Sequence, residues 1–552
     1  MQKIDIVGLG GMNEIGRKLY VFESGKDIFI FDAGMKFPED IMFGIDKIIP
    51  DFTYLKNNKK RVKAIFISNI SDENIGALSM LMQVVEAPIC GSKFTVSVLK
   101  REIANRSQVF QTLIPMKKYK FGGITISAFS MTFSLPGNLG FLIETPNGNF
   151  SYISDYVFNN NVTGLYETNY EHLASLRNAN VLALISPVKG AETNGYGVSQ
   201  SKFSQNLENS LQKTSGAVFI NTFTKNFLII QKAIIVAEKV GRKVCVIGKK
   251  GYELINIAVR SHAIKIERDT LVSAKRASSM KTKDIMYLVL GDEGMPFDLM
   301  LDILSDANRE VRVQKNDKAY MVVPKIPGSE LKISKVIDEL FKKGIPTEII
   351  DFNNISINMA CVEDMKLLYN FIKPKYLIAT DGENRQIVEF ENKMSQFGVD
   401  PQNIILCNNG EWISFVDGEH TKSELTNLVL EEILVNGNVL EDSDNYILKE
   451  REQLSADGVV ILTVALLEKV NKYEAQYVNY QSLGFIPAKD QKVLIAKIKE
   501  SVVAVVESSN TSNSQTRINE LKRKIQEAIN QTIYREIKRH PVVVIQFILQ
   551  KK

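Results

Sequence analysis

The chain has 552 residues, of which 45% are hydrophobic and 24% are charged, with a formal net charge of +5. This apolar fraction is typical of packed globular proteins and excludes a disordered chain, and the length favours about three or four domains. No apolar run reaches the roughly 18–20 residues that a membrane-spanning helix needs, and the N-terminal residues lack the pattern of a signal peptide. We therefore expect a cytoplasmic protein outside the membrane, whose mild basic charge permits nucleic-acid binding without requiring it.

Cysteine and histidine are both scarce in this sequence. The cysteines are Cys90, Cys245, Cys361 and Cys407. The histidines are His172, His262, His420 and His540. Cysteines this far apart, without a C-x-x-C pair, are expected to be buried free thiols rather than a disulfide framework. Histidines this far apart exclude any local histidine motif for a metal ion.

The first 200 residues alternate short apolar strands with turn signals. We predict strands at residues 4–7, 19–23, 27–32, 62–68, 124–130, 139–144, 149–154 and 180–186. The turn at residues 24–26 predicts an antiparallel hairpin, and residues 72–85 have the periodicity of a helix. Many early antiparallel strands with interspersed helices favour an α/β sandwich over a doubly wound parallel sheet.

From about residue 199 the pattern changes to alternating strands and helices, which predicts a parallel sheet covered on both faces. We predict helices at 201–213, 227–240 and 331–343, and strands at 217–221, 243–247, 286–290 and 318–323. A helix at 363–372 precedes a return to short strands at 376–380 and 404–407.

The last hundred residues are predicted to form a small βαβα unit. Its segments are residues 458–467, 491–506, 517–538 and 542–547. The helix at 517–538 carries an apolar stripe of Ile518, Leu521, Ile525, Ile529 and Ile533. Because these residues keep helical spacing, we expect the stripe to face a core or a dimer partner.

Several segments, in order along the chain, resemble the bacterial ribonuclease J family. They are G-L-G-G-M-N-E-I-G at 8–16, F-D-A-G at 31–34, F-P-E-D at 37–40, G-D-E-G-M-P at 291–296, I-P-G-S-E at 326–330, K-P-K-Y at 373–376, G-E-N-R at 382–385 and R-H-P at 539–541. Each match alone is weak, but their order and spacing extend over essentially the whole chain.

The resemblance implies a metallo-β-lactamase αββα sandwich with an inserted parallel-sheet β-CASP domain and a small α/β C-terminal domain. The implied limits are 1–200 and 371–420 for the metallo-β-lactamase domain, 201–370 for the β-CASP domain, 421–450 for a linker and 451–552 for a C-terminal oligomerisation domain.

Members of this family hydrolyse RNA with two metal ions, which activate a water molecule and stabilise charge on the phosphate. The resemblance places the family's ligand positions on Asn69, Ser71, Glu73, Asn74, Phe133, Asp155 and Asp381. None of these residues is a histidine, although the family motif H-x-H-x-D-H falls on residues 69–74. Losing a mere partner of a ligand typically costs about 10–100-fold in metal affinity or activity. We therefore expect these positions to be degenerate, with no catalytic residue, no zinc and no other cofactor.

Two alternatives remain open at this site. Glu73, Asp155 and Asp381 together offer oxygen ligands, which suit Mg²⁺ or Mn²⁺. A shift of one residue would place Asp72, rather than Glu73, in the carboxylate position. Such a carboxylate site would make the chain a weakly active or metal-dependent 5′-exo- or endoribonuclease.

The resemblance therefore favours a catalytically inactive, RNA-binding subunit in mRNA decay and rRNA processing. Its expected partner is an active ribonuclease J paralogue or a second copy of itself, in a dimer or tetramer. A scaffold bound to the ribosome or to other RNA-decay proteins is a further hypothesis. The candidate RNA contacts are Lys225, Asn226, Ser329, Asn358 and Arg385. The first two precede a predicted helix, whose N-terminus favours anions, but each of the five also fits a loop cap or a surface charge.

Overall fold

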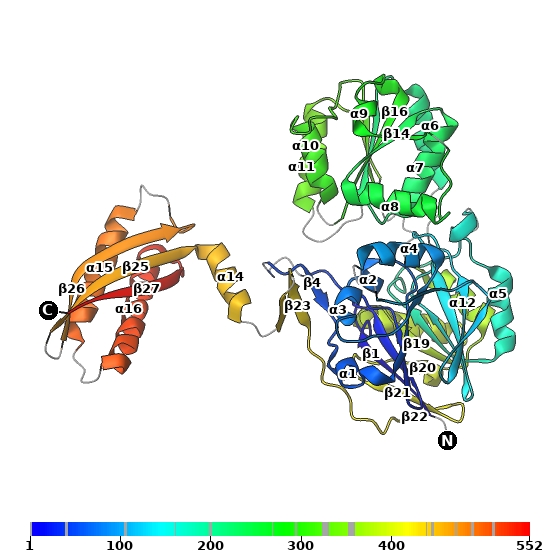
Figure 1. Cartoon of the computed structure of the whole chain (residues 1–552), viewed down its shortest axis with the longest axis horizontal. Helices are drawn as coiled ribbons and strands as arrows, with labels where there is room; N and C mark the ends of the chain where they lie inside the picture. The colour runs from blue at the N-terminus through cyan, green and yellow to red at the C-terminus, as the bar shows by residue number, and fades with distance from the viewer. Residues whose placement is uncertain are drawn as a thin grey trace. The chain divides into compact units, whose positions relative to one another are not determined.

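The computed structural model describes residues 3–38, 42, 44–103, 107–159, 162–197, 201–267, 269–292, 295–322, 330–350, 359–437, 439–442, 446–469, 472–486, 491–509 and 514–551 (Figure 1). The chain divides into two compact units. The larger unit consists of Met1–Phe37 and Lys47–Val435, and the smaller one of Pro38–Asp46 and Asn436–Lys552. None of the helices in the described ranges combines the length and hydropathy needed to cross a membrane.

Two mixed β-sheets form the centre of the larger unit. The first has the spatial order β22 (Glu419–Thr421), β21 (Trp412–Val416), β1 (Lys3–Gly10), β2 (Leu19–Ser24), β3 (Asp27–Phe31), β5 (Val62–Phe66), β6 (Ile89–Gly91) and β7 (Phe110–Thr112). The second has the order β20 (Ile404–Ile405), β19 (Tyr376–Thr380), β12 (Val181–Pro187), β11 (Gly148–Ile153), β10 (Leu139–Thr145), β9 (Ile124–Ser130) and β8 (Lys118–Phe121). The expected hairpin at residues 24–26 is confirmed, because Ser24 pairs with Asp27.

The two sheets pack face to face, and alternation along their strands explains why. On β3, Phe29 and Phe31 point into the core between the sheets, whereas Ile28 and Ile30 point to the opposite, helix-covered face. The Phe31 ring lies 5.8 Å from that of Phe141 on the second sheet, measured between ring centroids. An interface rich in aromatic rings buries a large apolar area and so fixes the sheets against each other.

Helices cover the outer face of each sheet. On the first sheet these are α1 (Thr53–Asn57), α2 (Asp72–Ile75), α3 (Leu78–Leu81) and α4 (Lys93–Glu102). On the second they are α5 (Tyr170–Ser175), α12 (Val362–Ile372) and α13 (Asn384–Gln396). Short 3₁₀ turns are η1 (Lys59–Arg61), η2 (Gly164–Tyr166), η3 (Leu176–Ala179), η4 (Thr282–Asp284) and η6 (Pro401–Asn403). This layering is the predicted αββα sandwich.

A six-stranded parallel sheet interrupts this sandwich between β12 and β19. Its order is β15 (Leu271–Val272), β14 (Lys243–Ile247), β16 (Ile285–Gly291), β13 (Val218–Phe223), β17 (Lys318–Val322) and β18 (Thr347–Ile349). Its helices are α6 (Ser201–Lys213), α7 (Phe227–Lys239), α8 (Lys249–Arg260), α9 (Ala274–Ala277), α10 (Met295–Leu304) and α11 (Glu330–Lys342). Neighbouring residues of β13 pack into different cores, Ile220 on one face and Phe219 on the other, so the sheet is buried on both sides as predicted.

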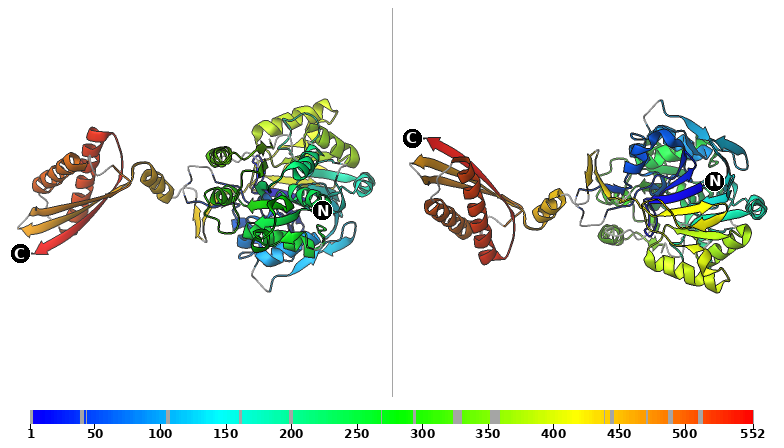
Figure 2. Two further views of the ribbon diagram at one scale, coloured as in Figure 1. Left: turned by 90° about the horizontal axis from the view of Figure 1, so that it is seen from above. Right: turned by 90° about the horizontal axis from the view of Figure 1, so that it is seen from below.

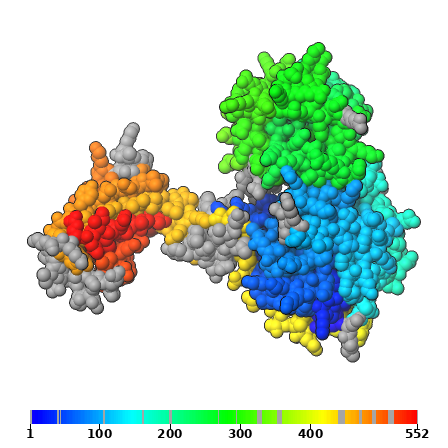
Figure 3. Space-filling model, in the orientation of Figure 1, coloured from blue at the N-terminus to red at the C-terminus, as the bar shows by residue number. Residues whose placement is uncertain are grey.

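This inserted domain packs directly on the sandwich. The ring of Phe227 in α7 lies 5.6 Å from that of Phe94 in α4. The backbone N–H of Leu228 donates a hydrogen bond to the carbonyl oxygen of Ser134. In the space-filling view, green atoms of the inserted domain adjoin blue atoms of the sandwich (Figure 3). Hydrophobic packing and backbone hydrogen bonding therefore both join the two parts of the larger unit.

The predicted helix at 72–85 is wrong in its length. The structure has two short helices instead, α2 and α3, separated at Gly76 and Ala77. A Cβ atom on Gly76 would lie 2.3 Å from Cγ of Met35. The backbone at Gly76 passes so close to Met35, which directly follows the F-D-A-G segment, that only glycine fits there, and the helix is interrupted at this point.

The smaller unit differs from the predicted βαβα order. Its elements are β24 (Val439–Asp442), α14 (Tyr446–Asp457), β25 (Val459–Lys469), β26 (Lys472–Leu483), α15 (Gln491–Ser508), α16 (Ser514–Ile537) and β27 (Val542–Lys551). The sheet has the order β26-β25-β27, with α15 and α16 on one face (Figure 2). Strand β26 was missed because its sequence alternates polar and aromatic residues without a buried apolar run. The apolar stripe of α16 lies in the core of this unit, with Ile525, Ile529 and Ile533 fully buried.

A short antiparallel ribbon pairs residues 47–49 of β4 (Lys47–Ile49) with residues 433–435 of β23 (Ile433–Asn436). All four cysteines are free and buried, as predicted. The domain limits expected from the resemblance stay predictions.

Candidate functional site

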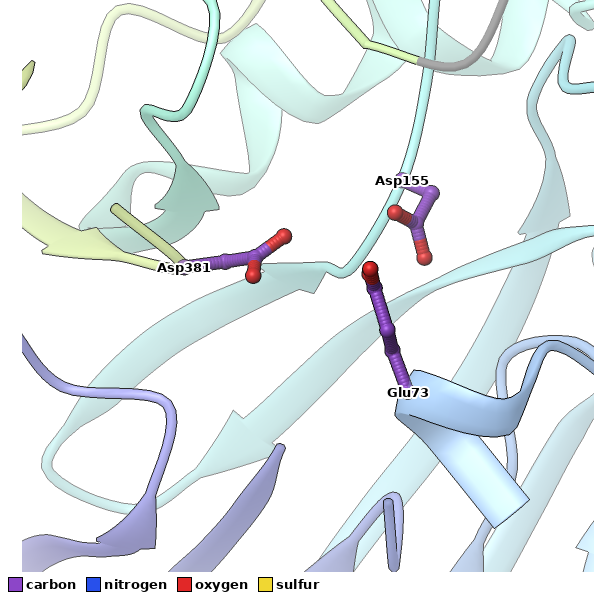
Figure 4. A group of neighbouring side chains, drawn as sticks. All are labelled: Glu73, Asp155 and Asp381. Carbon is purple, nitrogen blue, oxygen red and sulfur yellow. The ribbon is translucent and has the colours of Figure 1, made fainter. Parts of the chain in front are cut away.

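Three carboxylates converge where strands of the sandwich end. Glu73 lies in α2, Asp155 follows β11 and Asp381 follows β19. Figure 4 shows the three side chains pointing toward one another from these separate elements. One oxygen from each carboxylate lies within 4.8 Å of the others. The structure therefore brings together the three carboxylates that the sequence suggested as one site. Helix α2 contributes Glu73, rather than Asp72, to this group.

The topology explains this convergence. Strands β11, β12 and β19 run parallel, so their carboxyl ends meet at one edge of the second sheet. Helix α2 reaches this edge because Gly34 leaves room for it, since a Cβ there would lie 1.5 Å from the carbonyl oxygen of Glu73. Asp381 has a φ of 48°, a left-handed conformation that aspartate tolerates better than most residues. These local features aim the carboxylates at a common point.

Two lysines fill the space between these carboxylates. Lys18, directly before β2, places its Nζ atom 2.9 Å from Asp155, 3.0 Å from Asp381 and 3.4 Å from Glu73. Lys189, just after β12, places its Nζ atom 3.0 Å from Glu73, 3.1 Å from Asp381 and 3.5 Å from Asp155. Each ammonium group therefore contacts all three carboxylates. The Lys18 side chain is completely buried and that of Lys189 is 14% exposed.

The charges in this cluster stabilise one another. Burial alone would lower the pKa of Lys18, but the charges of Asp155, Asp381 and Glu73 outweigh it and raise that pKa well above 10.5. The pKa of Lys189 is raised for the same reason. Burial would likewise raise the pKa values of Asp155 and Asp381, but the two ammonium groups lower both. Both lysines and both aspartates are therefore charged at neutral pH.

Neutral donors hold the outward oxygens of the two aspartates. Oδ2 of Asp155 accepts hydrogen bonds from Nδ2 of Asn69 at 3.1 Å and from Oγ of Ser154 at 3.0 Å. Oδ1 of Asp381 accepts one from the backbone N–H of Gly16 at 3.0 Å. These bonds orient the carboxylates toward the ammonium groups.

The other expected ligand positions hold side chains that do not present a ligand. Nδ2 of Asn69 also donates to Oδ1 of Asn138 at 3.0 Å, so both amide hydrogens of Asn69 are used. Nδ2 of Asn74 donates to Ser154 at 2.8 Å, and its Oδ1 accepts from Oγ of Ser71 at 2.7 Å. These amides and hydroxyls form a hydrogen-bond network around the carboxylates.

Phe133, at another expected ligand position, is 5% exposed and packs in the hydrophobic core shared by the first sheet, its helices and the inserted domain. A phenyl ring has no lone pair for a metal ion. The three carboxylates are thus in contact with two ammonium groups, the donating amide of Asn69 and the hydroxyl of Ser154. This donor set does not fit the pair of metal ions that the resemblance implies, nor a single Mg²⁺ or Mn²⁺ held by the carboxylates.

Three of the candidate RNA contacts lie within the described residues, and each has partners there. Lys225 makes an ion pair with Asp72, and its side chain is 23% exposed. Asn226, directly before α7, is buried and donates to Oγ1 of Thr222 at 3.1 Å. Arg385 is 67% exposed and pairs with Glu192 and Glu383. Ser329 and Asn358 lie outside the described residues.

Sequence reasoning missed the two residues that define this site, Lys18 and Lys189. The available signal was weak. Lys18 directly precedes the apolar strand β2, and Lys189 follows the equally apolar β12. A lysine at such a boundary usually reaches solvent. Only the folded structure shows that the ammonium groups of both lysines face the same three carboxylates.

Facing sheets under helices, with a parallel sheet inserted between β12 and β19, define a metallo-β-lactamase-type protein with a β-CASP domain. A family profile described as "Ribonuclease J, beta-CASP domain" matches residues 215–340, and one described as "Ribonuclease J C-terminal domain" matches residues 446–549. In these two regions the chain is therefore similar to the β-CASP and C-terminal domains of the ribonuclease J family.

Curated relatives extend the similarity along the chain. A protein named "Ribonuclease J 2" from Staphylococcus saprophyticus is 27% identical over 556 residues, covering 98% of this chain and 98% of that protein. A Staphylococcus aureus protein of the same name is 27% identical over 548 residues, covering 98% of this chain and 97% of its own. A solved structure of an Enterococcus faecalis protein of unknown function superposes with a TM-score of 0.52 and 15% identity, over 75% of this chain and all of that one. This last likeness concerns the fold alone.

Proposed function

We propose that this chain is a non-catalytic, RNA-binding member of its family that acts in RNA processing and decay beside a partner that carries the histidines. The observation behind this proposal is that the seven expected ligand positions supply no imidazole, and that Asn69 points donor hydrogens at the carboxylate of Asp155. A metal-dependent hydrolase needs lone pairs at these positions, because its metal ions activate the attacking water.

The arrangement of the Asn69 amide supports this reading. Its nitrogen faces two oxygen acceptors, on Asn138 and Asp155, and its Oδ1 accepts from the backbone N–H of Ser71 at 2.9 Å. Turning the amide over would place its oxygen against two acceptors and its nitrogen against a donor. The amide therefore cannot offer an oxygen to an ion near Asp155 without losing three hydrogen bonds.

RNA binding is supported by the similarity to this family and by the names of the curated relatives. Within the chain, Lys225 stands next to the N-terminus of α7, a site that favours a phosphate group. Its ion pair with Asp72 is partly exposed, so a phosphate can compete for the same ammonium group. We propose Lys225 and Arg385 as phosphate contacts, and Asn226 as the buried residue that shapes the start of α7.

The second candidate function is a ribonuclease that uses a carboxylate-bound Mg²⁺ or Mn²⁺. The convergence of Glu73, Asp155 and Asp381 favours it. The ammonium groups of Lys18 and Lys189 oppose it, because each already contacts all three carboxylates. We therefore place this function second.

The test combines hydrolysis and binding on the purified full-length chain. Single-stranded RNA with a 5′-monophosphate is incubated with Mg²⁺, Mn²⁺ or Zn²⁺, alone and with a relative that carries the H-x-H-x-D-H motif. We expect salt-dependent RNA binding, no hydrolysis by the chain alone, and co-purification with the histidine-bearing relative. Metal-dependent hydrolysis by the chain alone would overturn the non-catalytic role, and RNA binding that is absent at low salt would overturn the RNA-binding role.

A further inference from the structure

The contacts of Lys18 and Lys189 share the same three oxygen atoms. Oε2 of Glu73, Oδ1 of Asp155 and Oδ2 of Asp381 each lie within 3.5 Å of both Nζ atoms. Every one of these oxygens therefore bridges two cations. In a centre with two metal ions, carboxylate oxygens bridge the two cations in the same way. Here the two cations are the ammonium groups of lysine side chains.

We propose that the ammonium groups of Lys18 and Lys189 are tethered substitutes for a pair of metal ions. They neutralise the carboxylates, fasten the ends of the sheets to α2, and exclude divalent cations from the cluster. This inference deepens the proposed function by assigning the degenerate site a structural role, and its test does not involve RNA.

The charge balance supports the substitution. Three carboxylates and two ammonium groups leave one net negative charge in a cluster whose aspartates and Lys18 are at most 1% exposed. Without the lysines, two buried carboxylates would face Glu73 at close range, and such like charges repel strongly in a medium of low polarity. A compensating cation is therefore required for the fold, and the chain supplies it covalently.

The placement of the lysines makes them a link between separate elements. Lys18 directly precedes a strand of the first sheet, whereas Glu73 lies in α2. Asp155, Lys189 and Asp381 follow strands of the second sheet. The backbone reinforces this link, because the N–H of Lys18 donates to the carbonyl oxygen of Glu73 at 3.2 Å. The cluster therefore joins the two layers of the sandwich at the edge where family members are expected to hold metal ions.

Geometry also explains why a divalent cation does not enter. The nitrogen–oxygen distances of 2.9–3.5 Å are those of close ion pairs, and two of these contacts, from Lys18 to Asp155 and from Lys189 to Glu73, are also hydrogen bonds. Mg²⁺ binds oxygen at about 2.0–2.1 Å and demands near-octahedral ligands, so it needs space that the ammonium groups occupy. Replacing one lysine by a small residue should open that space. It should also change the net charge of the cluster from one negative charge to two, which one divalent cation would neutralise.

The test uses the full-length chain and its Lys189→Ala variant, both washed with a chelator and then melted with and without Mn²⁺. We expect no effect of Mn²⁺ on the parent chain. We expect the variant to melt at a lower temperature in chelator and to gain about 3 °C when Mn²⁺ reaches about a hundredfold excess over its dissociation constant. Electron paramagnetic resonance should count one bound Mn²⁺ in the variant and none in the parent chain.

Lys225→Ala is the matched control, because it removes an ammonium group whose ion pair with Asp72 lies outside the cluster. This control should not respond to Mn²⁺. Mn²⁺ stabilisation of the parent chain equal to that of Lys189→Ala, or a variant that ignores Mn²⁺, would overturn the proposal. Either result would leave RNA binding unaffected, so this inference and the proposed function fail separately.

A second measurement covers the case in which Lys189→Ala does not fold. The parent chain is treated with an amine-acetylating reagent in the presence of Mn²⁺ or chelator, and its lysines are scored by mass spectrometry. Lys18 and Lys189 should resist modification under both conditions, whereas Lys239, whose side chain is 64% exposed, should react. Modification of Lys189 that rises when Mn²⁺ is added would show that the ion displaces the ammonium group, and would overturn the proposal.

Discussion

The Nζ atom of Lys18 lies 2.9 Å from Oδ1 of Asp155, and the two side chains are 0% and 1% exposed. Buried ion pairs of this kind contribute little when compared with apolar packing, but removing one partner leaves an uncompensated buried charge. The stability of the sandwich therefore depends on keeping the charges of this cluster balanced.

Replacing Lys18 by methionine should destabilise the larger unit by about 3–5 kcal/mol, because the cluster then holds two uncompensated negative charges. Asp155→Asn alone also destabilises, because the lysines lose a charged partner. The double variant restores the original net charge, so it should be more stable than the sum of the two single effects predicts, by about 0.5–3 kcal/mol. Denaturant unfolding of the four proteins measures this coupling, and strict additivity would contradict the cluster.

The carboxyl group of Asp32 should make stability depend on pH. Burial raises the pKa of Asp32 from 3.8 to about 6, although hydrogen bonds from Ser68 and Tyr152 and the charge of Lys18 favour its ionised form. Because the unfolded chain releases this proton at lower pH, raising the pH from about 4 to about 6 favours unfolding, and above that range the effect is constant. At about 1.36 kcal/mol per pKa unit, the loss is about 3 kcal/mol.

Asp32→Asn removes this titration while keeping a side chain of similar size. The unfolding free energy of the variant, relative to that of the parent chain, should therefore increase between pH 4 and 6 and level off by about pH 7. Urea unfolding at several pH values measures the difference. A difference that does not change with pH would show that Asp32 has its ordinary pKa in the folded chain.

Lys225→Ala should weaken RNA binding and reduce the slope of log affinity against log salt by about one, because one phosphate contact is lost. The control is Lys239→Ala, which removes a lysine from the other end of α7 that pairs with Glu208. Fluorescence anisotropy with a short single-stranded RNA over a salt series gives both the affinity and the slope. An equal loss of RNA affinity in the two variants would mean that Lys225 contributes only to the overall positive charge of the protein.

The stripe of α16 should matter for folding of the smaller unit. Ile529 is fully buried, so Ile529→Ala should cost about 2–5 kcal/mol. Val544 in β27 is 45% exposed, and Val544→Ala should cost less than about 1 kcal/mol. Hydrogen exchange of residues 514–551 in the full-length chain reports on this unit. Comparable protection from hydrogen exchange in the two variants would show that the apolar stripe of α16 does not form the core of the smaller unit.

The sequence predicted the αββα sandwich, the parallel sheet and the meeting of Glu73, Asp155 and Asp381, because these follow from strand order and from the resemblance. It did not predict strand β26, whose alternating pattern, with Tyr477 62% exposed, gives only a weak strand signal. The break at Gly76 was also missed, because a close approach to Met35 depends on the folded chain.

The lysines were missed for a different reason. Lys18 and Lys189 are 171 positions apart, and neither stands in a pattern that distinguishes a buried lysine from an exposed one. Their shared role depends on three carboxylates that arrive from α2, β11 and β19. This proximity arises only when the two sheets pack against each other, so local sequence patterns do not predict it.

The most direct measurement of the central claim is the metal content of the unaltered chain after saturation with Zn²⁺ and Mn²⁺ and passage through a desalting column. Because each of the three carboxylates already contacts both ammonium groups, the account predicts no metal above background. Recovery of one or two equivalents of firmly bound ion, lost on Asp381→Asn, would contradict it.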